Sequence, residues 1–139
     1  MLILDANILV RAVLGRRVLE LIDTYSETAE LAAPDAAFRD AWEHVPRVAR
    51  RRNRNPEALL ATLEALGKSI RLVEFHEYAP FEPQARLRME RRDPDDWPIL
   101  ACALAMHCAI WTEDTDFFGV GVATWTTDNV ELFFGAATG

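Results

Sequence analysis

Acidic residues beside short apolar segments are the most chemically informative feature of this 139-residue sequence. Asp5 directly follows the N-terminal apolar run, and Asp96 stands at the start of a longer apolar stretch. Asp114 and Asp116 follow a third apolar segment. Carboxylates that crowd together raise one another's pKa and destabilise the folded protein unless a cation compensates them. The pattern therefore points to a site for a divalent cation.

Magnesium is the ion that an all-carboxylate site suits. Mg²⁺ prefers oxygen ligands in octahedral geometry and binds through a few carboxylates, several waters and phosphate oxygens of a substrate. Such a site can activate water for phosphodiester hydrolysis. The dispersed histidines His44, His76 and His107 have no zinc-type spacing, and the sequence contains neither a glycine-rich phosphate loop nor a nucleophile-elbow serine.

The segments that must position these acids alternate between strand-like and helix-like patterns. The apolar run at residues 1–4 is too short for a helix and suits a strand that is buried on both faces. The other strands are expected at residues 30–33, 70–75, 109–112 and 122–126. The helices are expected at residues 8–14, 18–25, 34–51, 56–66, 77–91, 99–107 and 128–134, the last of them ended by Gly135. This alternation predicts an α/β fold, a three-layer α/β/α sandwich around a mainly parallel sheet.

In such a sheet the acids can converge. Ligands of open α/β sheets bind at the carboxyl ends of the strands, where Asp5, Asp114 and Asp116 would lie. Asp96, at the start of a helix, would face the same edge. Asp5 could instead only cap the following helix, because Asp is a favoured N-cap residue. The further acids in comparable positions favour the metal site.

The charge distribution bears on nucleic-acid binding. A net charge of −7 argues against it, because phosphate contacts need Lys and Arg. Arginines nevertheless cluster at residues 47–54 and 86–92, and arginine matches phosphate and carboxylate alike. We take Arg47, Arg50 and Arg51 as candidate RNA-binding residues. Solvated helix faces are the alternative interpretation of both clusters.

Length and composition predict one domain over residues 1–139. No apolar run approaches the roughly 20 residues that span a membrane, and the N-terminus does not resemble a signal peptide. Cys102 and Cys108 lie on one expected helix and are not expected to form a disulfide, which fits a reducing compartment. We therefore expect a cytoplasmic protein without membrane attachment.

The order of these motifs resembles that of the PIN domain, a family that includes the VapC-like ribonuclease toxins of bacterial and archaeal toxin–antitoxin pairs. The resemblance covers essentially the whole chain, and its carboxy-terminal part is the most specific. The motifs that carry it are Leu4-Asp5-Ala6-Asn7, an acid on the second long helix, Asp96-x-x-Ile-Leu-Ala-x-Ala103 and Thr112-x-Asp114-x-Asp116-Phe117.

The resemblance implies specific roles for the matching residues. It implies that Asp5, Asp96 and Asp114 bind the metal directly or through water, with Asp116 as a further acid.

It also implies that Asn7 and Thr112 hold the acids by hydrogen bonds. The family usually has a glutamate a few residues past the second strand. The six-residue offset from Pro34 favours Asp40 as this acid, and Glu43 is the alternative.

The activity that the resemblance implies is a Mg²⁺- or Mn²⁺-dependent endoribonuclease. Its catalytic residues would be Asp5, Asp40, Asp96 and Asp114. RNA would be the substrate, a cognate antitoxin would inhibit the enzyme, and a homodimer would be the expected assembly.

Two other functions fit parts of the pattern. A non-catalytic PIN-like domain would bind RNA or protein through its arginines, which the negative net charge and the unusual helical acid leave open. A phosphoacceptor receiver domain also uses aspartates at strand ends. That domain needs a lysine after a later strand, and the only lysine, Lys68, is in the wrong place.

Overall fold

The computed structural model describes the backbone of residues 1–138 and the side chains of residues 1–135. Five strands form one sheet in the order β3-β2-β1-β4-β5, and every neighbouring pair is parallel. The prediction of a parallel sheet is thus confirmed. The strands are β1 (Leu2–Leu4), β2 (Leu31–Pro34), β3 (Arg71–Val73), β4 (Ala109–Trp111) and β5 (Thr124–Trp125).

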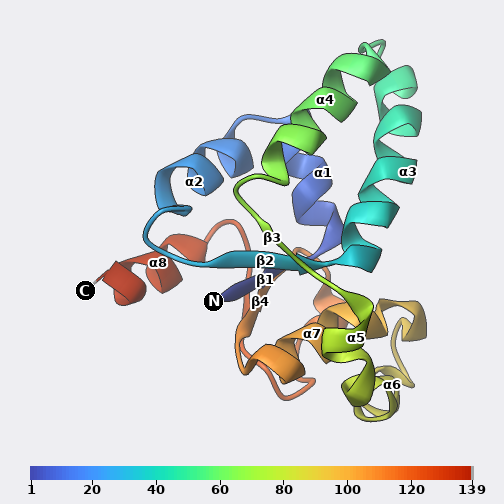
Figure 1. Cartoon of the computed structure of the whole chain (residues 1–139), viewed down its shortest axis with the longest axis vertical. Helices are drawn as coiled ribbons and strands as arrows, with labels where there is room; N and C mark the ends of the chain where they lie inside the picture. The colour runs from blue at the N-terminus through green and yellow to red at the C-terminus, as the bar shows by residue number, and fades with distance from the viewer. Residues whose placement is uncertain (139) are drawn as a thin grey trace.

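Helices cover both faces of this sheet, which confirms the three-layer arrangement. Figure 1 shows α1 to α4 on one side of the strands and α5 to α7 on the other. The α-helices are α1 (Ala6–Leu14), α2 (Arg17–Tyr25), α3 (Asp35–Arg51), α4 (Pro56–Leu66), α5 (Phe75–Tyr78), α6 (Glu82–Met89), α7 (Trp97–Met106) and α8 (Val130–Thr138). Three short 3₁₀ turns are η1 (Ala79–Phe81), η2 (Pro94–Asp96) and η3 (Thr115–Phe117).

The central strand explains why the N-terminal run is apolar throughout. Leu2, Ile3 and Leu4 are completely buried, because helices pack on both faces of β1 and strands flank it on both sides. Helix α7 packs directly on β1, β2 and β4. Burial of a large aliphatic side chain contributes about 1.5–3 kcal/mol. The central strand therefore anchors the edge at which its following residue, Asp5, emerges.

Two expected elements are shorter than the sequence predicted. The single helix expected at residues 77–91 is divided into α5, η1 and α6, because Pro80 and Pro83 lack the N–H groups that a continuous helix needs. The strand expected at residues 70–75 ends at Val73, and Glu74 caps helix α5 instead.

The boundaries of two other helices also differ. Pro34 does not open the long helix: it is the last residue of β2 and the N-cap of α3. Gly135 does not end the last helix, which continues to Thr138. Tertiary packing explains the continuation in part, because Phe134 is buried, stacks on Tyr25 and contacts Trp111 edge to face.

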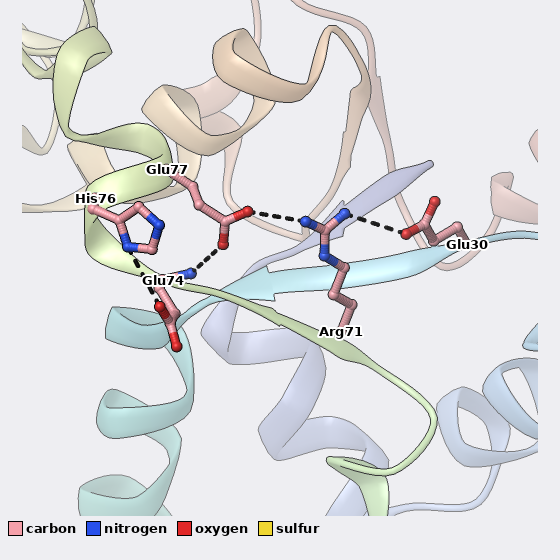
Figure 2. Close-up of polar contacts among 5 residues, drawn as sticks. All are labelled: Glu30, Arg71, Glu74, His76 and Glu77. Atoms are coloured by element: carbon pink, nitrogen blue, oxygen red, sulfur yellow. Dashed lines mark hydrogen bonds and ion pairs between the residues drawn. The ribbon is translucent and has the colours of Figure 1, made fainter.

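Ion pairs join the edge strand β3 to its neighbours (Figure 2). Arg71 pairs with Glu30 at 3.5 Å and with Glu77 at 2.9 Å. The second carboxylate oxygen of Glu77 accepts a hydrogen bond of 2.8 Å from the Glu74 backbone N–H. His76 Nδ1 lies 3.3 Å from Glu74 Oε2. This network ties the start of α5 to β3 at the exposed edge of the sheet.

Among the helices that the structure describes, none is both long and apolar enough to cross a membrane.

Candidate active site

The order of the strands brings together two segments that are far apart in the sequence. Strand β1 lies beside β4, with Leu4 opposite Trp111, and the backbone N–H of Asp5 donates to the Trp111 carbonyl at 3.1 Å. The chain passes from β1 to β2 and β3 on one side and then crosses to β4 on the other. Open α/β sheets bind ligands at such a reversal of strand order. Asp5 and Thr112 are the first residues past the two strands at this point.

Asp5 is held from three directions. Its Oδ2 accepts hydrogen bonds from the Thr112 hydroxyl at 2.7 Å and from the Asn7 side-chain amide at 3.0 Å. Its Oδ1 accepts from the Ala6 N–H at 2.7 Å, so the residue also caps α1. Burial raises the pKa of Asp5, and the hydrogen bonds from Thr112 and Ala6 partly oppose that shift. The helix cap and the candidate site therefore use the same carboxylate.

Asp114 is positioned through the same threonine. Its backbone N–H donates to Thr112 Oγ1 at 2.9 Å, and its Oδ1 accepts from the Asp116 N–H at 2.9 Å. Asp114 is thus the N-cap of the η3 turn, and its carboxylate is fixed beside that of Asp5.

Four of the predicted acids line one cavity of about 480 Å³. Each comes from a different part of the chain: the end of β1, helix α3, the start of α7 and the loop after β4. The acids are Asp5, Asp40, Asp96 and Asp114. Two other predicted residues, Asp116 and Glu43, do not line this cavity. On α3 it is therefore Asp40 that faces the other three acids.

Burial is the main cause that raises the pKa values of Asp5, Asp40 and Asp96, and neighbouring acids add to each shift. Burial raises the pKa of Asp96 to about 8, and the charges of Asp5, Asp93 and Asp114 add to the shift. Burial also raises the pKa of Asp40; the charge of Glu43 adds to that shift, and Arg39 opposes it. Among the described residues, no ion pair neutralises any of the four cavity acids.

The donor set of the cavity fits a hard divalent cation. Its acids offer carboxylate oxygens, which Mg²⁺ and Mn²⁺ prefer. Asn7 also lines the cavity, and its Oδ1 is a buried acceptor that has no hydrogen-bond partner among the described residues. Buried polar atoms of this kind are uncommon and call for a ligand or water. Within residues 1–135, however, no three acid, His or Cys side chains are grouped closely enough to hold an ion as they stand.

Arginines of the second cluster, at residues 86–92, contact other groups of the same chain. Arg92 donates to the carbonyls of Asp116 and Phe118, and Arg88 donates to the Val120 carbonyl at 3.0 Å. Arg86 pairs with a neighbouring glutamate on α6 and lies 5.0 Å from the centre of the Trp97 ring. These contacts hold the loop after β4 and the first turn of α7, and thereby the elements that carry Asp114 and Asp96.

The first arginine cluster lies at the exposed end of α3. Arg47, Arg50 and Arg51 are exposed, and none of them lines the acidic cavity. The next residue, Arg52, does line it, as does Arg11 from α1.

Sequence reasoning missed four ionisable residues of the cavity wall, and helical spacing could have found three of them. Asn7, Val10, Arg11 and Leu14 share one face of α1, and Asp40, His44, Val48 and Arg52 follow at intervals of four along and just beyond α3. The fourth missed residue, Asp93, caps the η2 turn. The residues missed were Arg11, His44, Arg52 and Asp93.

Comparison with known proteins agrees with this arrangement. A sequence model of the PIN domain matches residues 3–134, almost the whole chain. This match excludes the receiver-domain interpretation. No curated protein matches the chain by sequence.

Solved structures share the fold, and one of them is a toxin–antitoxin complex. A chain of the VapBC2 complex of Rickettsia felis, bound to a promoter DNA fragment, superposes with a TM-score of 0.70 at 13% identity, covering 90% of this chain and 97% of that chain. FitAcB from Neisseria gonorrhoeae gives 0.66 at 20% identity, with 91% and 98% covered. A toxin–antitoxin complex from Klebsiella pneumoniae gives 0.64 at 20% identity, also with 91% and 98% covered.

Proposed function

Because the chain belongs to the PIN-domain family, we propose that residues 1–139 form a single metal-dependent endoribonuclease domain, the toxin of a toxin–antitoxin pair. The observation that carries this proposal is the convergence of four acids from four segments on one cavity, without an ion pair to neutralise them. Such a concentration of negative charge is costly unless a cation binds there.

In this proposal Asp5, Asp96 and Asp114 hold Mg²⁺ or Mn²⁺, and Asp40 completes the set from α3. The ion, when bound, would activate water and stabilise negative charge on the phosphate in phosphodiester hydrolysis. Asp116 bonds to Asp114 and Arg92 through its backbone N–H and carbonyl, and it does not line the cavity. We therefore do not include Asp116 among the proposed metal ligands.

The protein residues around the acids keep this set in place. Thr112 orients Asp5 and Asp114 through one hydroxyl group, and the Asn7 side-chain amide donates to the same Asp5 oxygen. Asp96 must lose its proton to bind a cation, since its pKa without one is about 8. Cation binding and deprotonation of Asp96 are therefore linked.

We further propose an antitoxin partner and a homodimer. One of the solved structures that share the fold is a toxin–antitoxin complex from Klebsiella pneumoniae, and the VapBC2 and FitAcB structures share it too. A basic side chain of an antitoxin that enters the cavity would neutralise the acids and displace the metal. Cys102 and Cys108 are both free thiols, which suits action in the reducing cytoplasm.

Cleavage of a mixed RNA pool tests the enzyme. The purified protein should cut RNA with added Mg²⁺ or Mn²⁺ and should be inactive with EDTA. Asp96→Ala should reduce the rate by at least about a hundredfold, corresponding to about 2.7 kcal/mol. Asp23→Asn is the matched control, because Asp23 is an exposed acid on α2 outside the acidic cavity.

The second candidate function is an RNA-binding PIN domain without catalysis. The absence of a closed metal-ligand group in the part of the chain that the structure describes favours it. If calorimetry detects no Mn²⁺ uptake and no condition yields cleavage, the binding domain replaces the enzyme.

A further inference from the structure

A second cavity, of about 680 Å³, adjoins the acidic cavity. The two cavities share Arg11, Leu14 and Arg52 in their walls, so these side chains border both the acidic cavity and the second cavity. The end of α1, the start of α2 and the residue after α3 form most of its lining.

Arginines dominate the charge of this second cavity. Its cations are Arg11, Arg16, Arg17 and Arg52, against two acids, Glu113 and Asp128. We call these four residues the cavity arginines.

Most of the cavity arginines are free to bind a ligand. Arg17 pairs with Glu131 at 3.1 Å. Arg11, Arg16 and Arg52 are exposed, and none of them makes a side-chain hydrogen bond or ion pair with a described residue.

The two acids do not balance the four arginines: Glu113 Oε1 accepts a hydrogen bond of 2.7 Å from the Thr127 N–H, and neither Glu113 nor Asp128 forms an ion pair with a cavity arginine. The cavity therefore presents unpaired positive charge to solvent, within a protein whose net charge is −7.

The backbone at the start of α2 favours an anion as well. Gly15, Arg16, Arg17 and Val18 line the cavity, and α2 begins without a capping side chain. The first N–H groups of a helix have no partner within the helix and carry partial positive charge, which attracts phosphate. The side chains and the helix end thus favour the same kind of ligand.

We propose that the cavity arginines bind backbone phosphates of the RNA whose cleaved phosphate lies at the acidic cavity. This inference rests on the proposed function. Arg11 follows Asp5 by six residues, roughly 9 Å along α1, a distance that a few nucleotides of a single strand can span. The RNA would run from the acids past Arg11 and Arg52 towards Arg16 at the start of α2.

The continuity of the two cavities favours RNA over an acidic protein segment. RNA would match both cavities, because one of its phosphates would contact a metal ion in the acidic cavity and its next phosphates would contact the cavity arginines. A carboxylate-rich peptide would match only the second cavity. Arginine also binds phosphate in a fork of two parallel hydrogen bonds. The assignment places the RNA path along α1 and α2 and past Arg52, whereas Arg47, Arg50 and Arg51 line neither cavity.

Binding of a labelled single-stranded RNA in EDTA tests the path without cleavage. For the double variant Arg11→Ala/Arg16→Ala we expect affinity to fall by roughly tenfold at about 0.1 M salt. The slope of log affinity against log salt should become less negative by about 1.4, because each lost phosphate contact on a single strand removes about 0.7. The matched control is Arg50→Ala/Arg51→Ala, a pair that the sequence suggested for RNA binding but that lines neither cavity, so we expect it to keep the wild-type affinity and slope.

The outcomes separate this inference from the proposed function. If both double variants weaken binding equally, or if only the control pair does, the cavity is not the RNA subsite. If polyglutamate of matched charge displaces the RNA at equal concentration, the cavity binds an acidic protein segment instead. If the cavity variant alone weakens RNA binding and the wild type never cleaves RNA with metal, the subsite stands and the nuclease proposal fails.

Discussion

The hydroxyl group of Thr112 donates a hydrogen bond of 2.7 Å to Oδ2 of Asp5, although the two residues are 107 positions apart. Thr112 is completely buried and Asp5 is 6% exposed, so water does not compete for this bond. The same hydroxyl oxygen accepts the backbone N–H of Asp114. One threonine therefore aligns the acids that follow β1 and β4.

Thr112→Val removes this alignment with little change of shape. The variant removes one hydrogen-bond partner from the Asp114 N–H and one from Asp5 Oδ2. We therefore expect the free energy of unfolding to fall by about 1–3 kcal/mol. We expect Mn²⁺ affinity to fall by roughly 10–100-fold, as for other residues that orient metal ligands. Denaturant unfolding and calorimetric Mn²⁺ titration measure the two effects.

The pH dependence of this variant separates orientation from a general loss of stability. The Thr112 hydrogen bond lowers the pKa of Asp5, so its removal raises that pKa further. The deficit in Mn²⁺ affinity should therefore be larger at about pH 6 than at about pH 8. Thr62→Val is the control, because the Thr62 hydroxyl on α4 donates only to the Ala58 carbonyl, in an exposed hydrogen bond outside the acidic cavity. Equal Mn²⁺ affinities for Thr112→Val and wild type would refute the assigned role.

Asp96 should make the stability of the metal-free protein fall with rising pH. Its pKa is raised from 3.8 to about 8 in the folded protein, so the folded state binds its proton more tightly than the unfolded state. The contribution to stability is complete below about pH 4 and is lost as pH rises through about 8. With the partial exposure of Asp96 taken into account, the loss is on the order of 1–2 kcal/mol.

Thermal unfolding in EDTA at about pH 5 and about pH 8.5 measures this loss. Wild type should lose more stability over the interval than Asp96→Asn, which has no proton to release at this position. Added Mn²⁺ should restore stability to the wild type at the higher pH, since a ligand that binds only the folded state stabilises it. Identical pH profiles for the two proteins would show that Asp96 does not carry the shift.

Asp40, rather than Glu43, should contribute to metal binding and cleavage. Asp40 lines the acidic cavity, whereas Glu43 is exposed and outside it. Asp40→Asn should lower Mn²⁺ affinity and the cleavage rate by at least about tenfold, or 1.4 kcal/mol. Glu43→Gln should lower both by less than about threefold, through loss of its charge near Asp40. The reverse order of the two effects would assign the helical acid to Glu43.

Two glycine substitutions should change stability in opposite directions. Gly121 has φ +95°, and a Cβ atom there would lie 2.6 Å from Arg88 Nη1, so Gly121→Ala should cost about 1–3 kcal/mol. Gly135 lies within α8, and a Cβ atom there would meet no described atom within 4 Å. Gly135→Ala should therefore stabilise the protein by about 0.5–1 kcal/mol through higher helix propensity. Denaturant unfolding of both variants tests the signs, and a stabilised Gly121→Ala would contradict the packing of Arg88 on the loop.

The sequence by itself determined the α/β alternation, the buried first strand and the identity of the acids at the strand ends. These features are local: an apolar run, a proline or an Asp after a strand restricts the backbone wherever it occurs. Pro80 and Pro83 divide the helix expected at residues 77–91 for a local reason, whereas the end of the last helix depends on tertiary packing. Gly135 lies inside a helix because Phe134 packs against Tyr25 and Trp111, and spacing along the chain carries no record of that contact.

The tertiary structure alone decided which polar groups share a cavity. Only the pairing of β1 with β4 brings Thr112 to Asp5, and only the packing of α3 on α1 turns Asp40 rather than Glu43 towards the other acids. The arginine clusters show the same division, because Arg88 and Arg92 bind carbonyl groups of a loop more than 20 residues away. Composition gives the number of arginines, but only the fold determines which of them bind groups of the same chain. Arg11 and Arg16 bind no described residue through their side chains and remain free for a ligand.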